Sequence, residues 1–170
     1  YIRQNIGFEK EKNSFINLQK QMFKSFLKVN SLTKLKITYH KYYKLFKKIP
    51  IKEKTNALKV GIIGELYTIM EPFANYYLET ELAKMNIEVK RFTNVHYLLF
   101  EKKRKSKKYL KSAKEYVKYK MGSDASDNIA RCKYLCNNNY DGIIHIKSSF
   151  CTPEISVMPI INKICSSKNV

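Results

Sequence analysis

The chain has 170 residues, of which 44% are hydrophobic, so it is long enough for one domain with a real core. Its net charge of +19 raises the question of a nucleic-acid or acidic partner. No apolar run approaches the roughly 18 to 20 residues of a membrane span, and no signal-peptide pattern is present, which predicts a soluble, cytoplasmic protein. Because the chain opens on Tyr1 and ends at Val170, where a new strand is expected, we predict a piece of a longer protein.

The positive charge is concentrated in two segments. Residues 1–59 hold 15 basic and 3 acidic side chains, and residues 101–121 hold 10 and 2. Only four of the 33 basic residues are Arg, the side chain preferred for bidentate phosphate and base contacts. The composition therefore favours solvated, Lys-rich helix faces. An acidic partner is the next interpretation, and specific nucleic-acid recognition is the least favoured.

The first part of the chain predicts two amphipathic helices. Apolar residues recur at spacings of three and four over residues 13–29 and again over residues 33–48, and Pro50 follows as a stop. We expect these helices to form a basic hairpin. The segment from Pro50 to Asn56 is the one plausible internal boundary, which predicts a basic helical extension over residues 1–56 and an α/β domain over residues 57–170.

From residue 58 the pattern changes to strands alternating with helices. The run 58–64 predicts a buried strand, and a polar, turn-forming stretch follows it to Pro72. Asn75 is the expected cap of a helix through Met85, and residues 87–92 predict a second strand. This is a strand-helix-strand unit, for which a right-handed connection and parallel strands are expected. A long basic helix or helix pair then covers residues 97–121.

The last third predicts helix, strand and helix. Capping residues at 122–128 open a helix to about Asn138, residues 143–146 form a strand, and Pro153 suits the first turn of a final helix in which Pro159 introduces a kink or marks a later start. The expected fold is α/β: a Rossmann-like three-layer domain with a small, mostly parallel sheet of three or four strands and an N-terminal helical extension.

The candidate site lies where the predicted strands end. The loops 64–67, after Phe92, and 148–154 should gather at the carboxyl edge of the sheet, where open α/β sheets bind ligands. Cys151 is the lead residue, because it follows a strand and precedes a helix whose first N–H groups favour a thiolate. The sequence has no glycine-rich dinucleotide motif, P-loop, HExxH or CxxC, so the corresponding functions lack support.

The other cysteines and the histidines favour structural roles. Cys132 and Cys136 are four residues apart on a helix, an acceptable metal spacing, but core packing is the favoured interpretation for both and for Cys165. His145 alternates within a strand and is expected to be a satisfied core residue rather than a ligand. Cys151 is as plausible a ligand or reactive thiol as a structural residue.

Two blocks resemble a known family. The sequence KVGIIGELYTIMEPFANYYLETELAKMNIEV, Lys59 to Val89, and the sequence GSDASDNIARCKYLCNNNYDGIIHIKSSFCTPEI, Gly122 to Ile155, resemble proteins related to 2-hydroxyacyl-CoA dehydratase components and their CoA-substrate-specific activases. The elements Gly-Glu-x-Tyr, Pro-Phe-x-Asn, Asp-Gly and Phe-Cys-x-Pro-Glu occur in that order. The resemblance covers roughly residues 58–165 and leaves out the basic hairpin.

The resemblance implies an iron–sulfur protein. It implies a Rossmann-like domain that helps hold a [4Fe–4S] cluster for ATP-driven, low-potential electron transfer, with Cys151 as a metal ligand. Glu65, Tyr67 and Glu154 are expected to line the same cleft, the first two making polar contacts. Because a cluster takes about four thiolates, the remaining ligands must come from a neighbouring domain or subunit, and an ATP-hydrolysing activator is a further expected partner. The piece alone is expected to be inactive as an enzyme.

A different class of function stays open beside this one. The Lys-rich surface is also compatible with a noncatalytic binding domain that docks an acidic protein or, less favoured, a nucleic acid.

Overall fold

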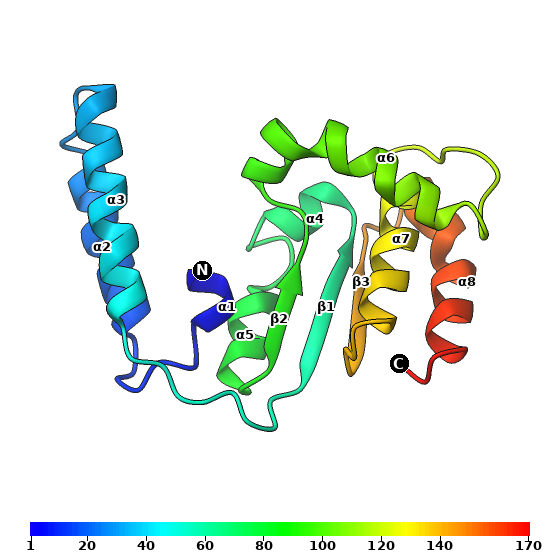
Figure 1. The fold of residues 1–170 in the computed structure, drawn as a ribbon, viewed down its shortest axis with the longest axis horizontal. Helices are drawn as coiled ribbons and strands as arrows, with labels where there is room; N and C mark the ends of the chain where they lie inside the picture. Colours follow the sequence, from blue (N-terminus) through cyan, green and yellow to red (C-terminus); the bar gives the residue numbers. More distant parts are fainter. The chain divides into compact units, whose positions relative to one another are not determined.

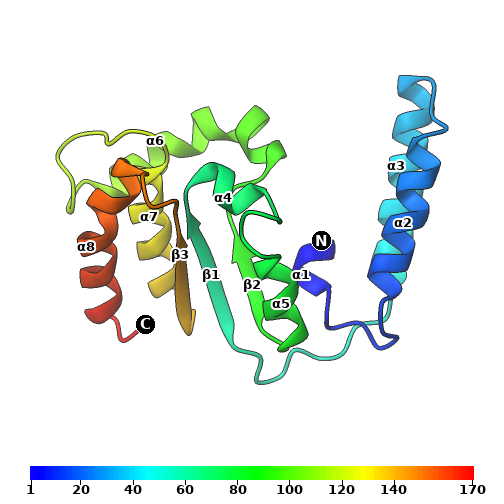
Figure 2. The same cartoon turned by 180° about the vertical axis from the view of Figure 1, so that it is seen from behind.

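The computed structural model describes residues 1–170, apart from the side chains of residues 3 and 4. The chain forms two compact units, one made of residues 1–57 and 79–88 and the other of residues 58–78 and 89–170. Figures 1 and 2 show the ribbon from opposite sides, and each unit is described below by itself. The expected boundary near residue 56 lies next to the first division, whereas the assignment of residues 79–88 to the first unit has no counterpart in the sequence pattern.

The first unit contains the basic helical hairpin. It begins with the short helix α1 (Ile2–Asn5), followed by α2 (Ser14–Phe26) and α3 (Leu32–Lys48), so both predicted helices are confirmed with bounds shifted by a few residues. The rings of Phe15 and Phe46 stack between α2 and α3 with centroids 6.2 Å apart. The hydroxyl of Tyr42 donates to the carbonyl of Gln21 at 3.1 Å. The unit therefore has its own small aromatic core, with lysines on the outside.

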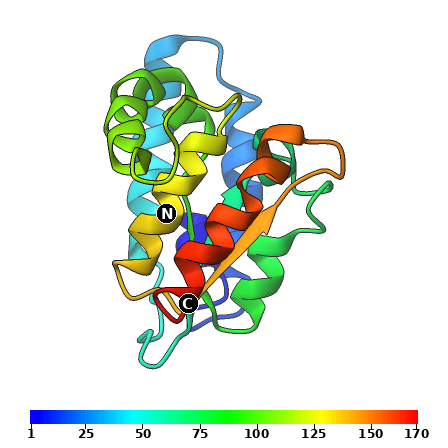
Figure 3. The same cartoon turned by 90° about the vertical axis from the view of Figure 1, so that its right-hand side faces the viewer.

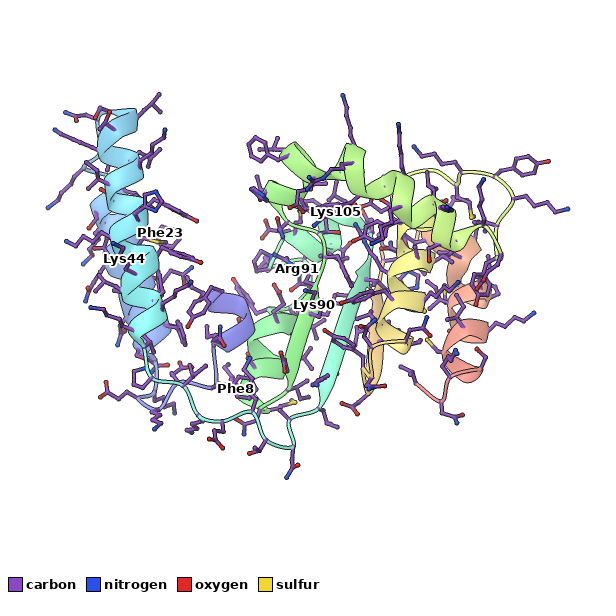
Figure 4. All side chains as sticks on the ribbon, in the orientation of Figure 1. Phe8, Phe23, Lys44, Lys90, Arg91 and Lys105 are labelled. Atoms are coloured by element: carbon purple, nitrogen blue, oxygen red, sulfur yellow. The ribbon has the colours of Figure 1, made fainter. Side chains whose placement is uncertain are left out.

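The second unit is built on a small sheet. Strands β1 (Lys59–Gly64), β2 (Glu88–Arg91) and β3 (Gly142–Ile146) are arranged in the order β2-β1-β3. Strands β1 and β3 are parallel, in a register that pairs Val60 with Gly142 and Gly64 with Ile146. All three predicted strands are confirmed. Figure 4 labels Lys90 and Arg91 on β2, and the Arg91 guanidinium donates to the carbonyl of Ile69 at 2.8 Å.

Two short helices come between β1 and β2 in the sequence, and the second of them falls almost wholly in residues 79–88 of the first unit. Helix α4 (Leu66–Met70) occupies the stretch for which the sequence predicted only turns, and α5 (Leu78–Lys84) is the predicted helix before β2. The expected cap is confirmed, because Asn75 Oδ1 accepts from the backbone N–H of Leu78 at 3.2 Å.

Three longer helices complete the second unit. A π-helical turn, η1 (Tyr97–Glu101), leads into α6 (Lys102–Ala113), and α7 (Ala125–Cys136) and α8 (Thr152–Ser166) follow. Helix α7 contacts α6, α8 and β1, and Figure 3 shows α7 and α8 side by side. Helix α6 ends at Ala113, earlier than predicted, and the N–H groups of Tyr116 and Val117 both donate to the Ala113 carbonyl, at 2.9 and 3.1 Å. Pro159 lies inside α8, which begins at Thr152 as one helix.

The close approach of α7 to the sheet depends on a glycine. A Cβ at Gly61 would collide with the side chain of Leu135, so the absence of a side chain lets α7 rest directly on β1. Ile63 points to the same face two residues later and joins the main core with Ile129, Val157 and other residues of α7 and α8.

The observed architecture is thus mixed α/β with a small open sheet, as the alternation of patterns predicted. In the described part of the chain, no helix combines the length and the apolar character that crossing a membrane requires.

Candidate functional site

The loops after β1 and β3 meet at one edge of the sheet. The N–H of Glu65 donates to the carbonyl of Ile146 at 2.8 Å, and the N–H of Ser148 donates to Glu65 Oε2 at 3.0 Å. The hydrogen bond from Thr68 is the main cause that lowers the pKa of Glu65, and the Ser148 N–H adds to it while partial burial opposes it. The Glu65 carboxylate therefore ties two loops together at the carboxyl edge, where the sequence predicted a site.

Cys151 lies at this edge, directly before α8. It is the residue that caps α8, is partly buried, and has no side-chain hydrogen bond in that position. Its N–H donates to the carbonyl of Ser148 at 3.3 Å, and its carbonyl accepts from Ile155 at 3.0 Å. The location at the end of a strand and the start of a helix is as predicted, and the thiol is not sealed inside the apolar core.

Two large aromatic side chains near this edge are left in solvent. Phe150, beside Cys151, is 94% exposed, and Tyr67, in the first turn of α4, is 66% exposed. Because Glu65 begins α4 and accepts from Ser148, the start of α4 and the loop that carries Phe150 are held together. Tyr67 is thus at the expected edge, although no hydrogen bond of its hydroxyl is among the described contacts.

Glu154 is placed differently from the expectation. It was predicted to line an open cleft with Glu65 and Tyr67, but its side chain is fully buried, with 0% exposure. The His145 ring nitrogen Nε2 lies 2.7 Å from Glu154 Oε2, and Asn128 Nδ2 donates to both carboxylate oxygens at 2.9 and 3.1 Å. A buried carboxylate needs such partners, so Glu154 anchors the first turn of α8 from inside.

The same network reaches β1 and α7. Asn128 Nδ2 also donates to the carbonyl of Gly64 at 2.9 Å, and Asn128 Oδ1 accepts from Arg131 Nη1 at 2.9 Å. His145 is therefore a bonded, mostly buried residue, as the sequence favoured. The start of α8, the end of β1 and the face of α7 are joined by one set of hydrogen bonds beneath Cys151.

Arg131 is the largest fully buried side chain of the protein among the described residues. Its Nη1 donates to Oγ1 of Thr93, the second residue after β2, at 3.0 Å. Its guanidinium carbon lies over three aromatic rings, at 5.8, 5.2 and 5.9 Å from the centroids of Phe92, Tyr97 and Tyr109. The sequence analysis counted Arg131 only as one of four arginines. Its position on an otherwise apolar helix face was the one signal that could have predicted its burial.

Two acidic residues at the start of α7 face α6. Asp124 is paired with Lys102 Nζ at 2.7 Å, and Asp127 accepts from Ser106 at 3.2 Å and from the Tyr97 hydroxyl at 3.4 Å. Burial raises the pKa of Asp127, which the Arg131 charge partly offsets. Burial also raises the pKa of Tyr97 to about 12. These groups hold α6 against α7 through polar contacts.

The outer side of α6 carries a basic hollow. It has a volume of about 870 Å³ and is lined by Lys102, Lys103, Arg104, Ser106, Lys107, Leu110 and Lys120. Helix α6 has no acidic residue in its first turn; Lys102 is paired with Asp124, whereas Lys103, Arg104 and Lys107 are exposed. A surface of this kind attracts anions at long range.

The other three cysteines gather elsewhere. The thiols of Cys132, Cys136 and Cys165 lie within 4.8 Å of one another, at the ends of α7 and α8. Cys165 is fourteen residues beyond Cys151 on α8, which corresponds to about 21 Å of helix rise. Among the described residues Cys151 therefore has no second thiol beside it. At that edge of the sheet, this chain can supply only one thiolate to a cluster.

Comparison with known proteins gives no relative: no family model, curated protein or solved structure matches this chain.

Proposed function

We propose that this chain is a Rossmann-like domain of a cytoplasmic iron–sulfur protein of the type that its two sequence blocks resemble, the 2-hydroxyacyl-CoA dehydratase components and activases. Cys151 supplies one ligand of a [4Fe–4S] cluster, and a neighbouring domain or subunit supplies the others. When bound, the cluster supplies low-potential electrons, which an ATP-hydrolysing activator replenishes.

The observation that carries the proposal is the placement of the Phe-Cys-x-Pro-Glu element. Phe150 is exposed, Cys151 is partly exposed at the carboxyl edge, and Glu154 is buried as an anchor below it. The Cys151 thiol lies at the start of α8 and is only partly buried, so a metal ion can reach it. Each part of the element thus has a physical role consistent with a ligand held in a fixed position.

The exposed aromatic residues support a neighbouring domain. Tyr67, in the first turn of α4, and Phe150, in the loop before α8, are exposed, and Glu65 ties these two segments together. Solvent-exposed aromatic side chains beside a ligand are what an adjoining protein surface would cover when it brings further thiolates. Glu65 and Tyr67 are the residues proposed for polar contacts with a bound group or with that partner.

The test uses the complete parent protein, prepared anaerobically with iron and sulfide. The wild type is compared with Cys151→Ser and with Cys165→Ser, which removes a thiol about 21 Å away along α8. We expect the visible absorbance of the cluster and its iron content to be lost in Cys151→Ser and kept in Cys165→Ser. Equal iron and absorbance in the two variants would contradict the proposal.

A second function is favoured by the hollow on α6: docking of an acidic protein partner without catalysis. The hollow is lined by four lysines and one arginine; Lys103, Arg104, Lys107 and Lys120 are exposed, whereas Lys102 is half-buried and paired with Asp124. Lysines, as point charges on flexible stems, suit a carboxylate-rich surface without fixed geometry. This proposal is independent of Cys151.

Its test measures binding of a poly-glutamate peptide and of single-stranded DNA over a range of salt. The triple variant Lys103→Ala, Lys107→Ala, Lys120→Ala is compared with Lys34→Ala, Lys36→Ala, Lys44→Ala, which removes the same charge from α3. We expect peptide affinity to fall with salt and to be weakened more by the α6 variant than by the α3 variant. Equal loss in both variants means that only net charge matters, and tighter DNA binding points to nucleic acid instead; either result overturns the proposal.

A further inference from the structure

Three thiols from two helices converge at one end of the second unit. Cys132 and Cys136 are one turn apart on α7, and Cys165 is in the last turn of α8. The Sγ atoms of Cys132 and Cys165 are 3.7 Å apart, and all three Sγ atoms lie within 4.8 Å of one another. All four cysteines of the chain are free.

We propose that Cys132, Cys136 and Cys165 bind one thiophilic cation, Zn²⁺, as three thiolates, with the fourth position taken by water or an external ligand. A tetrahedral zinc ion with Zn–S bonds of about 2.3 Å holds its sulfurs about 3.8 Å apart. The Cys132 and Cys165 thiols are already at that separation, and the widest pair needs to approach by about 1 Å at most.

The surroundings favour a cation and allow it to enter. Helix α7 ends at Cys136 and α8 ends at Ser166, and the C-terminal ends of helices carry partial negative charge. Cys132 is fully buried, Cys136 is 9% exposed and Cys165 is partly exposed, so the three residues are largely shielded from solvent and Cys165 is the most accessible. Such a site is protected from bulk water and still has an entry path.

The binding step balances without any redox change. One Zn²⁺ replaces the three thiol protons, which go to solvent, and three Zn–S bonds form while three S–H bonds break. The bound site carries a net charge of −1.

The proposed zinc site is separate from the proposed cluster site. Cys151 begins α8 and Cys165 ends it, so one helix carries both with about 21 Å between them. The zinc proposal therefore does not depend on the iron–sulfur proposal, and each can fail alone. The competing interpretations of the three thiols are apolar packing and a disulfide between Cys132 and Cys165, whose sulfurs would have to close to about 2.05 Å.

The experiment titrates the full chain, reduced with a phosphine under nitrogen, with Zn²⁺ against a chelator and with Co²⁺ as a spectroscopic probe. We expect one Zn²⁺ per chain, thiolate-to-cobalt charge-transfer absorbance with the visible bands of tetrahedral cobalt, and protection of three of the four thiols from an alkylating reagent. Absence of stoichiometric Zn²⁺ binding by the reduced wild type would overturn the proposal.

Variants decide which thiols are the ligands. Cys165→Ser and Cys136→Ser are expected to weaken Zn²⁺ binding by about 100-fold or more, since losing even an outer-shell partner of a metal ligand costs 10 to 100-fold. Cys151→Ser is the matched thiol control, with unchanged zinc affinity expected. If Cys165→Ser does not fold, the Zn²⁺ affinity of Cys136→Ser and the number of wild-type thiols protected from alkylation test the same assignment. Equal Zn²⁺ affinity in Cys136→Ser and Cys151→Ser would contradict the proposal. A disulfide that persists in the presence of the reductant would contradict it as well.

Discussion

Glu154 shows how a buried side chain can support a site without lining it. The residue belongs to the element that resembles a ligand motif, yet it has no exposure and is held by His145 and Asn128. The same Asn128 side chain holds the last carbonyl of β1. Substitutions here are therefore expected to act on the position of α8 and of Cys151 rather than through direct contact with a bound group.

We predict that Glu154→Gln lowers the free energy of unfolding by about 1 to 3 kcal/mol, because one buried donor on Asn128 or His145 is left without its acceptor. Urea denaturation followed by circular dichroism measures the change. The matched control is Glu115→Gln, an exposed carboxylate paired with Lys133, for which little change is expected. Similar losses in both variants would contradict an anchoring role for Glu154.

Asp127 is expected to influence stability in acid. Burial raises its pKa in the folded state above its ordinary value near 3.8, so the folded protein binds this proton more tightly than the unfolded chain does. The stability contributed by the protonated form is present below pH 3.8 and is lost as pH rises through the folded-state pKa. The carboxylate of Asp127 is thus a cost to the fold at neutral pH, partly offset by Arg131.

Asp127→Asn is predicted to remove this loss. The free energy of unfolding of the wild type, measured relative to the variant, should decline as pH rises from 3.8 through the folded-state pKa and then level off. Denaturant melts at several pH values give the difference directly. A difference that does not vary with pH would show that Asp127 has an unshifted pKa.

At the scale of elements, the contact between β1 and α7 decides the shape of the second unit. It depends on Gly61, whose missing side chain makes room for Leu135. A strand with two buried faces usually carries β-branched residues throughout, so a glycine inside it marks a close approach.

Gly61→Ala is predicted to destabilise the protein by about 1 to 3 kcal/mol, because the new methyl group overlaps Leu135 in a packed interface. Gly142→Ala on the paired strand is the matched control, since a Cβ there meets Val60 at an ordinary 3.9 Å. Thermal denaturation compares the two. If Gly61→Ala is no more harmful than Gly142→Ala, helix α7 does not rest on β1 as described.

At the scale of the whole molecule, the two units have separate cores. One core joins Phe15, Tyr42 and Phe46, and the other is centred on Ile63, Leu135 and the inner faces of α7 and α8. No buried residue of the described chain is shared by the two clusters, and we predict that the two cores unfold separately.

We predict that Phe15→Ala weakens protection from hydrogen exchange within α2 and α3 while leaving α7 and β1 protected, and that Leu135→Ala does the reverse. Each substitution creates a cavity in its own core and lowers the free energy of unfolding by about 2 to 5 kcal/mol. Exchange measured by mass spectrometry on peptide fragments resolves the two units. Loss of protection across the whole chain in either variant would show one cooperative unit instead.

The fold was predictable where the signal is local. The apolar spacing of three and four predicted the two hairpin helices, and short apolar runs beside turn residues predicted the three strands, because both signals lie in consecutive residues. The Asn75 cap and the placement of Cys151 between strand and helix followed from short-range chemistry as well. Helix α4 was missed because its single turn and a half is too short to show a period.

The side-chain clusters were not predictable, because they depend on how distant segments pack. Cys132 and Cys165 are 33 residues apart in sequence, and only the packing of α7 on α8 brings their sulfurs to 3.7 Å. The burial of Glu154 and Arg131 likewise arises where α7, α8 and the strand ends close over them. The sequence by itself determined which segments are helices and strands and which end of the sheet carries Cys151. Only the tertiary structure decided which polar groups and thiols meet, since the direction of a side chain in space is set by its element's neighbours.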